Sequence, residues 1–123
     1  MRRRPIEVRS RFRRALLTRA TIALSTIALF ELWFGIARSE RPIENTERLQ
    51  LFLAGGISVL PFESEDAEIA GDLRAALERA GTPIGHCDVL IAAHTIRLGA
   101  TLVTANGRAF VRVPGLTWED WAA

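Results

Sequence analysis

Residues 82–106, TPIGHCDVLIAAHTIRLGATLVTAN, carry the strongest indication of the fold. Asp88 begins an almost wholly apolar segment, because the five residues that follow it are all apolar. A helix over 88–98 would be apolar on nearly every side, so we expect it to be buried. Gly99 can end that helix, and the apolar run 100–104 then predicts a strand.

An ionised carboxylate at the start of a buried helix requires a compensating partner. Asp88 can act as the N-cap, because the first N–H groups and the positive end of the helix dipole stabilise a negative charge. It can equally bind a divalent cation. The neighbouring residues leave both interpretations open.

The composition indicates one globular domain with a basic leading arm. The chain has 123 residues, 49% of them hydrophobic, so we expect a single domain over 1–123 with a substantial core. Residues 1–19 contain eight Arg and one Glu, whereas the remainder has a net charge of −5. Such an arm attracts nucleic acid, an acidic partner or an anionic membrane surface. The lone cysteine, Cys87, excludes an internal disulfide framework and fits a reducing cytoplasm.

An apolar run at 20–37 follows the arginines and resembles a signal or anchor segment. Glu31 lies near its centre, where a carboxylate is costly in a bilayer, and a span needs about 20 apolar residues. We therefore expect a cytoplasmic protein without a membrane segment. A small membrane-anchored protein stays as a third hypothesis, behind the two given below.

Hydrophobic spacing predicts that helices and strands alternate along the chain. The predicted helices cover 5–17, 46–53, 64–80 and 88–98, together with one that Ser25 caps and that Gly35 or Ser39 ends. The predicted strands cover 21–24, 57–62, 100–104 and 110–113. Strands that alternate with helices of this length form parallel βαβ units with helices on both faces of the sheet. The predicted fold class is therefore α/β with a mostly parallel sheet.

Polar groups converge on the predicted carboxyl edge of that sheet, where open parallel sheets bind their ligands. Glu31 lies in the helix after the first predicted strand, and Asp88 begins the helix before the strand at 100–104. Thr104 and Asn106 lie where that strand ends. Oxygen donors select a hard cation such as Mg²⁺ or Mn²⁺, and these metals serve phosphodiester hydrolysis.

Each of these groups also has a structural explanation. Glu31 can pair with an arginine of the leading arm, and Asn106 before a glycine is most often part of a turn. A zinc site would draw on four nearby donors: His86, Cys87, Asp88 and His94. Their spacing matches no familiar zinc pattern, and we expect both histidines to be ordinary, partly exposed residues.

Two runs of sequence resemble one protein family. Residues 83–116, PIGHCDVLIAAHTIRLGATLVTANGRAFVRVPGL, are similar to the C-terminal half of PIN-domain ribonuclease toxins of the VapC type, with G-x-x-D-x-L-I-A-A followed by L-V-T-x-N-x-x-x-F. Residues 22–45, IALSTIALFELWFGIARSERPIEN, resemble the strand and helix of that family that carry E-L-x-x-G. The two motifs stand in the family's order, and together the two runs extend from residue 22 to residue 116.

The resemblance implies a three-layer α/β/α PIN-like fold and the toxin of a type II toxin–antitoxin system. It implies a Mg²⁺-dependent endoribonuclease, with Mn²⁺ as an alternative metal, an RNA substrate, a cognate antitoxin and a homodimer. By motif position Asp88 and Glu31 would be the metal ligands, supported by Thr104 and Asn106. Many relatives have Asp at the position of Asn106, and an acidic residue is common at the position of Ala109.

The chain departs from the family at its start. Relatives begin with a short central strand that ends in a metal-binding Asp, whereas RRRPIEVRSRFRRAL resembles the segment after that strand. Without it, the strands at 21–24 and 100–104 would each keep an unpaired buried edge, which is costly. Either the natural start lies upstream, or the chain is an N-terminally incomplete PIN domain. The second case gives the alternative function: a weak or inactive remnant that binds the cognate antitoxin.

Overall fold

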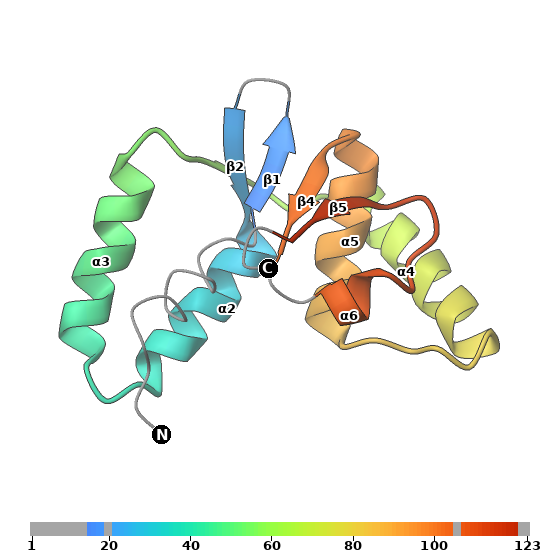
Figure 1. The fold of residues 1–123 in the computed structure, drawn as a ribbon, viewed down its shortest axis with the longest axis horizontal. Coiled ribbons are helices and arrows are strands. Elements are labelled where there is room, and N and C mark those ends of the chain that lie inside the picture. Colours follow the sequence, from blue (N-terminus) through green and yellow to red (C-terminus); the bar gives the residue numbers. More distant parts are fainter. Residues whose placement is uncertain (1–14, 19–20, 105–106, 121–123) are drawn as a thin grey trace.

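The computed structural model describes residues 15–18, 21–104 and 107–120, with side chains described from residue 23 onward (Figure 1). The strands are β1 (Ala15–Thr18), β2 (Thr21–Ser25), β3 (Ser58–Leu60), β4 (Thr101–Val103) and β5 (Thr117–Glu119). The helices are α2 (Thr26–Ala37), α3 (Pro42–Ala54), α4 (Ser64–Arg79), α5 (His86–Leu98) and α6 (Gly107–Phe110). Helices and strands alternate for most of the chain, as the hydrophobic spacing predicts.

The sheet has five strands in the order β3-β2-β1-β4-β5. β2 and β3 are parallel, and so are β4 and β5, whereas β1 is antiparallel to both of its neighbours. Four strands therefore point the same way and the central strand runs against them. The mostly parallel α/β sheet expected from the sequence is confirmed.

β1 occupies the central position that the sequence analysis expected to be empty. Leu16 pairs with Ala23 of β2 on one side and with Leu102 of β4 on the other. Two predictions are therefore wrong: the two inner edges are paired, and residues 15–17 form a strand instead of the end of a helix. The physical reason is that buried backbone groups must find partners, a requirement that outweighs a local helical pattern. The rest of that predicted helix, 5–14, lies outside the described residues.

The helices lie on both sides of this sheet. In Figure 1, α2 and α3 are on the side of β2, and α4, α5 and α6 are on the side of β4 and β5. The core forms between the sheet and these helices, and its largest fully buried apolar side chains are Leu24, Leu49, Ile91, Leu102 and Phe110. Most of the first three turns of α5 is buried, which confirms the prediction made from its apolar sequence.

The helix ends follow capping rules, with two differences from the predictions. Ser25 caps α2, since its Oγ accepts a hydrogen bond from the N–H of Ile27 (3.1 Å), and Gly99 ends α5 in the left-handed conformation (φ 62°). Asp88 is not the N-cap of α5: Gly85 holds that position and Asp88 lies in the first turn. α3 begins at Pro42, earlier than predicted, because proline suits the first turn of a helix.

The strand predicted at 110–113 is wrong. Residues Gly107–Phe110 form α6, and Val113 closes a turn by donating its N–H to the carbonyl oxygen of Phe110 (3.1 Å). The last strand is β5, in which Trp118 pairs with Leu102 of β4. Phe110 and Val113 are buried in the core from a helix and a turn, whereas Val111 is exposed. Period-two spacing alone does not distinguish this arrangement from a strand.

No described helix combines the length and hydrophobicity that a membrane span requires.

The pairing of β1 makes a testable prediction. Leu16→Pro removes a backbone N–H from a strand that has partners on both sides, whereas Leu16→Ala keeps that N–H. We expect the proline variant to be less stable than the alanine variant by about 2 kcal/mol, since a buried acceptor loses its donor. Urea unfolding followed by circular dichroism measures the difference, and equal stabilities of the two variants would contradict the pairing.

Candidate active site

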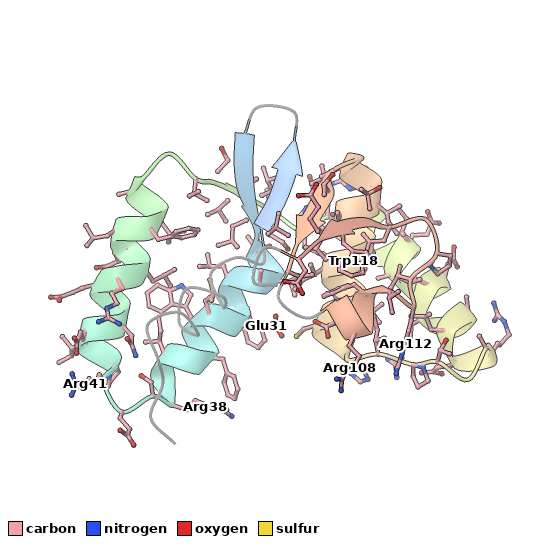
Figure 2. The ribbon with its side chains drawn as sticks, viewed as in Figure 1. Glu31, Arg38, Arg41, Arg108, Arg112 and Trp118 are labelled. Atoms are coloured by element: carbon pink, nitrogen blue, oxygen red, sulfur yellow. The ribbon has the colours of Figure 1, made fainter. Side chains whose placement is uncertain are left out.

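Glu31 lies on α2, six residues after the cap at Ser25. Its side chain is half-buried, and in Figure 2 it lies on the side of α2 that faces α6. α2 continues beyond the carboxyl end of β2, as Figure 1 shows, so this carboxylate stands outside the sheet at its carboxyl edge.

Asp88 lies in the first turn of α5, where the free N–H groups and the helix dipole favour a negative charge. Its side chain is half-buried and turned toward the start of the helix, because a Cβ added to Gly85 would lie 3.6 Å from Asp88 Oδ2. The electrostatic part of the capping interpretation therefore applies, although another residue is the cap.

Thr104 follows the last residue of β4 and is fully buried. Its N–H donates to the carbonyl oxygen of Glu119 (3.0 Å), which extends the pairing of β4 with β5 by one hydrogen bond. A short connection joins α5 to β4, so the helix runs back along the strand and Asp88 lies at the edge where β4 ends. Asn106 lies outside the described residues.

The structure thus brings three of the four predicted site residues to one edge of the sheet. α2 and α5 contact each other and run in opposite directions, which places Glu31 and Asp88 toward the same end of the helix pair (Figure 1). The donors they offer are carboxylate oxygens, which hard divalent cations prefer. Mg²⁺ is commonly held by one or two carboxylates together with water and substrate phosphates, so this donor set fits it.

The described residues support no zinc site. Among residues 15–18, 21–104 and 107–120, no three or more His, Cys, Asp or Glu side chains are grouped closely enough to hold a metal ion. Of the four donors considered from the sequence, His86 is exposed at the start of α5, whereas His94 is buried in its third turn.

Exposed arginines border this edge on both sides of Glu31. Arg38 lies just past the end of α2, and its guanidinium carbon is 5.1 Å from the centre of the Phe34 ring. Arg108 belongs to α6, and Arg112 follows it, donating from Nη1 to the carbonyl oxygen of Pro83 (2.9 Å). We call Arg38, Arg108 and Arg112 the arginine rim (Figure 2).

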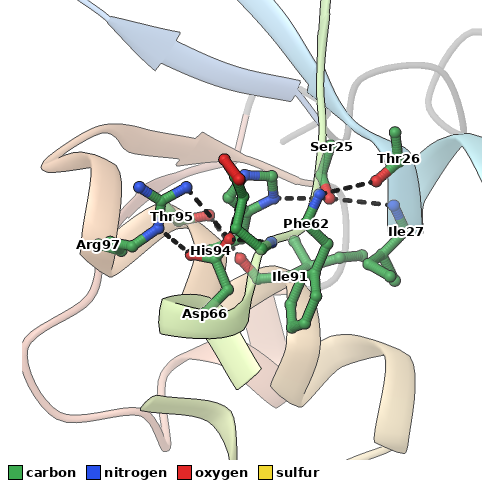
Figure 3. A network of polar contacts seen from close by, with 10 residues as sticks. Ser25, Thr26, Ile27, Phe62, Asp66, Ile91, His94, Thr95 and Arg97 are labelled. Atoms are coloured by element: carbon green, nitrogen blue, oxygen red, sulfur yellow. Dashed lines mark hydrogen bonds and ion pairs between the residues drawn. The ribbon is translucent and has the colours of Figure 1, made fainter. Parts of the chain in front are cut away.

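A buried polar network lies beside α5 (Figure 3). Ser25, Asp66 and His94 are all fully buried, and Arg97 is partly exposed. Asp66, in the first turn of α4, accepts the Glu63 N–H (2.7 Å) and two hydrogen bonds from Arg97, one of them from Nη2 (3.1 Å). Nδ1 of His94 lies 3.0 Å from Ser25 Oγ. The network therefore links α4, α5 and the start of α2.

The charges in this network are set by burial and by hydrogen bonds. Burial alone would raise the pKa of Asp66, but the hydrogen bonds from Arg97 and from the Glu63 N–H lower that pKa below its usual value. The hydrogen bond between Arg97 and Asp66 also raises the pKa of Arg97. Burial lowers the pKa of His94, against the smaller opposing effect of the Asp66 charge, so this histidine is neutral at pH 7.

The expectation that His94 is partly exposed is wrong, because its side chain is fully buried. Asp66 and Arg97 were not recognised as a buried ion pair, since they lie 31 residues apart. The sequence did contain a signal for the histidine: a polar residue within a helix that must be buried requires a hydrogen-bond partner.

Comparisons with known proteins find similarity to one family. The family model described as PIN domain matches residues 3–116. The chain is 41% identical over 101 residues to Ribonuclease VapC2 of Rickettsia felis, covering 82% of this chain and 75% of that protein. It is 37% identical over 119 residues to the tRNA(fMet)-specific endonuclease VapC of Shigella flexneri, covering 97% of this chain and 87% of that protein.

Solved structures give the same result. The crystal structure of VapBC2 from Rickettsia felis, bound to a DNA fragment from its promoter, matches with a TM-score of 0.78 and 40% identity, over 82% of this chain and 75% of that one. The structure of VapBC-1 from nontypeable Haemophilus influenzae matches with a TM-score of 0.77 and 28% identity, over 97% of this chain and 87% of that one.

The state of His94 predicts how stability depends on pH. The unfolded chain takes up a proton near the ordinary pKa of 6.5, whereas the folded chain takes it up only at lower pH. Stability is therefore present in full above pH 6.5 and falls as the pH drops below it, by at most about 1.4 kcal/mol per pH unit. The contribution of Asp66 is lost only below its ordinary pKa of 3.8, so it does not interfere above pH 5.

Urea unfolding at pH 7.5 and pH 5 tests this with a matched pair of variants. We expect His94→Gln to lose less stability than the wild type between the two pH values, because the buried imidazole is gone. The exposed His86→Gln is the control and should follow the wild type. A pH dependence that His94→Gln leaves unchanged would contradict the buried neutral state.

Proposed function

This chain belongs to the PIN-domain family and is a ribonuclease of the VapC type, and from that premise we propose that it acts as the toxin of a toxin–antitoxin pair. It cuts RNA phosphodiester bonds at the edge of the sheet toward which Glu31 and Asp88 both lie. The observation that carries the location is the opposed packing of α2 and α5, which brings two carboxylates to one end of the helix pair. Relatives named ribonuclease and tRNA(fMet)-specific endonuclease support the activity.

The proposed site takes a divalent metal ion, Mg²⁺ or Mn²⁺. Asp88 and Glu31 would hold it, with Thr104 and Asn106 as polar supports. When bound, the ion supplies positive charge that activates water and stabilises the attacked phosphate. The first turn of α5 orients Asp88, and the hydrogen bond from Thr104 to Glu119 fixes the end of β4 beside it. β1 has the sequence ALLT and contributes no carboxylate.

The substrate would lie across the arginine rim. Three exposed guanidinium groups on both sides of the carboxylates suit a phosphate backbone, because they attract it and position it without reading its sequence. The stacked position of Arg38 on Phe34 and the hydrogen bond of Arg112 to Pro83 restrict these side chains before RNA binds.

The proposed partner is a cognate antitoxin, as in the VapBC structures that match this fold. Large apolar side chains are exposed on α2 and α3: Phe30, Phe34, Ile43 and Leu51. Exposed apolar surface on a small protein is typical of a protein interface. We assign it to the antitoxin or to a second copy in a homodimer, with the cytoplasm as the site of action. No observation on the described residues favours the alternative of an inactive remnant.

Removing Asp88 tests the proposed site. We expect Asp88→Ala to lower Mg²⁺-dependent cleavage of a short RNA by about 100-fold or more, because the charge that positions the metal is lost. Asp72→Ala is the matched control, since Asp72 is exposed on α4, and it should cut at the wild-type rate. Cleavage that proceeds at an equal rate in Asp88→Ala would place the chemistry elsewhere.

The arginine rim predicts a change in salt dependence. In EDTA, where cleavage does not proceed, Arg38→Ala and Arg108→Ala should each weaken RNA binding. Each should also reduce the slope of log K against log salt by about 0.7, the value for one phosphate contact on a single strand. Arg79→Ala, an exposed change at the end of α4, serves as the control. Fluorescence anisotropy at several salt concentrations measures the slopes, and slopes equal to that of the control would exclude the rim from RNA binding.

A further inference from the structure

A contact between the side chains of Ser25 and His94 connects the start of α2 to α5. Ser25 caps α2, and His94 lies in the third turn of α5, 69 residues further along the chain. Their side chains are fully buried, with Ser25 Oγ 3.0 Å from His94 Nδ1 (Figure 3). The helix that carries Glu31 is thus joined at its N-cap to the helix that carries Asp88.

The surroundings of the ring decide the direction of this hydrogen bond. Nε2 of His94 faces the Asp66 carboxylate at 3.8 Å, too far for a hydrogen bond but close enough for a strong electrostatic effect. A protonated Nε2 is attracted to that carboxylate, whereas a bare lone pair would be repelled. The neutral ring therefore carries its proton on Nε2, and Nδ1 accepts the hydroxyl proton of Ser25.

Further contacts hold the ring and the start of α2 in place. Ser25 Oγ, while donating to the ring, accepts the Ile27 N–H (3.1 Å), and Thr26 Oγ1 accepts the N–H of Phe62 (3.1 Å). The Phe62 ring meets the His94 ring edge to face, with centroids 5.8 Å apart. The first turn of α2 is therefore held at two adjacent residues.

The proposed metal ligands lie well away from this contact along their helices, so a small change of helix angle at the contact moves them. Glu31 lies six residues after Ser25, and Asp88 lies six residues before His94. Because the helices run in opposite directions, both carboxylates lie about 9 Å along the helix axes toward the same end. A tilt of about 10° at the contact would displace one carboxylate from the other by about 1.5 Å, enough to disturb a shared ion.

We propose that Ser25 and His94 are positioning residues, whose hydrogen bond sets the angle between α2 and α5 at which Glu31 and Asp88 share one metal ion. The inference rests on the proposed function for the identity of the site. Neither side chain is proposed to touch the metal ion: Ser25, the last residue of β2 and the cap of α2, and His94 act through the helices that they join.

The stability of the fold does not by itself explain why position 94 holds a histidine instead of an apolar residue. The N-cap hydrogen bond of Ser25 to Ile27 needs no imidazole, and the neighbours of His94 on α5 are mostly apolar. Nε2 of His94 is buried without a hydrogen-bond partner among the described residues. An apolar side chain would avoid burying that polar atom, so the contact with Ser25 is the feature that requires a ring nitrogen here.

The test separates positioning from capping. Ser25→Gly keeps most of the capping preference but removes the hydroxyl, and His94→Leu removes the acceptor. We expect each to lower kcat for RNA cleavage at least tenfold with KM within twofold of wild type. Titration calorimetry with Mn²⁺ alone should show at least a tenfold loss of affinity. The double variant should be no worse than either single variant, because both changes break one contact.

Conservative variants and a matched control complete the design. Ser25→Thr keeps a hydroxyl and His94→Asn keeps a hydrogen-bond acceptor. Both variants should retain most of the wild-type kcat and Mn²⁺ affinity. Thr95→Val removes a buried hydroxyl from α5 whose hydrogen bond, within the described part of the chain, stays inside its own helix, to Ile91 O (2.7 Å). This variant should leave kcat and the Mn²⁺ affinity within twofold of wild type. All assays are run at least 15 °C below each variant's melting temperature, as measured by circular dichroism.

Wild-type kcat and Mn²⁺ affinity in Ser25→Gly and His94→Leu, or equal losses in Thr95→Val, would overturn the proposal. A wild-type chain that cuts no RNA would refute the proposed function instead. The Mn²⁺ titration would then still decide the positioning role: a tenfold loss supports it and an unchanged affinity overturns it.

Discussion

The backbone pairing of β1 is the constraint on which the rest of the structure depends. β2 with β3 forms one parallel pair, and β4 with β5 forms the other. Neither pair contacts the other directly in the sheet, so the strand between them makes the sheet continuous. β1 does this while running in the opposite direction, because an antiparallel ladder satisfies the same buried N–H and C=O groups. Joining the two pairs brings α2, which follows β2, against α5, which precedes β4.

Polar contacts then define how these elements meet. The Asp66–Arg97 pair ties the first turn of α4 to the last turn of α5, and Ser25 with His94 ties α5 to α2. A buried ion pair is weak evidence for stability, because its desolvation offsets much of the attraction. Its contribution here is geometric: these contacts link three helices, two of which carry the carboxylates that lie toward the same edge.

Local patterns predicted much of this structure. The buried α5 followed from its unbroken apolar run, and the cap at Ser25 followed from its position before an apolar helix. Motif positions likewise predicted which carboxylates stand at the carboxyl edge. Features that depend on contacts across the chain were missed. Residues 15–17 have a helical pattern locally, but they form a strand because they pair with β2 and β4. The burial of His94 depends on contacts with Ser25 and Asp66. No spacing rule relates residues that far apart.

The central claim is that Glu31 and Asp88 jointly hold one metal ion because β1 brings their helices together. A crystal structure of the chain soaked in Mn²⁺, with anomalous diffraction data, tests it most directly. The account predicts one anomalous peak contacted by carboxylate oxygens of both residues, with β1 antiparallel between β2 and β4. A peak bound by only one of the two carboxylates, with the other turned away, would contradict the account. So would a sheet in which β1 leaves that central position.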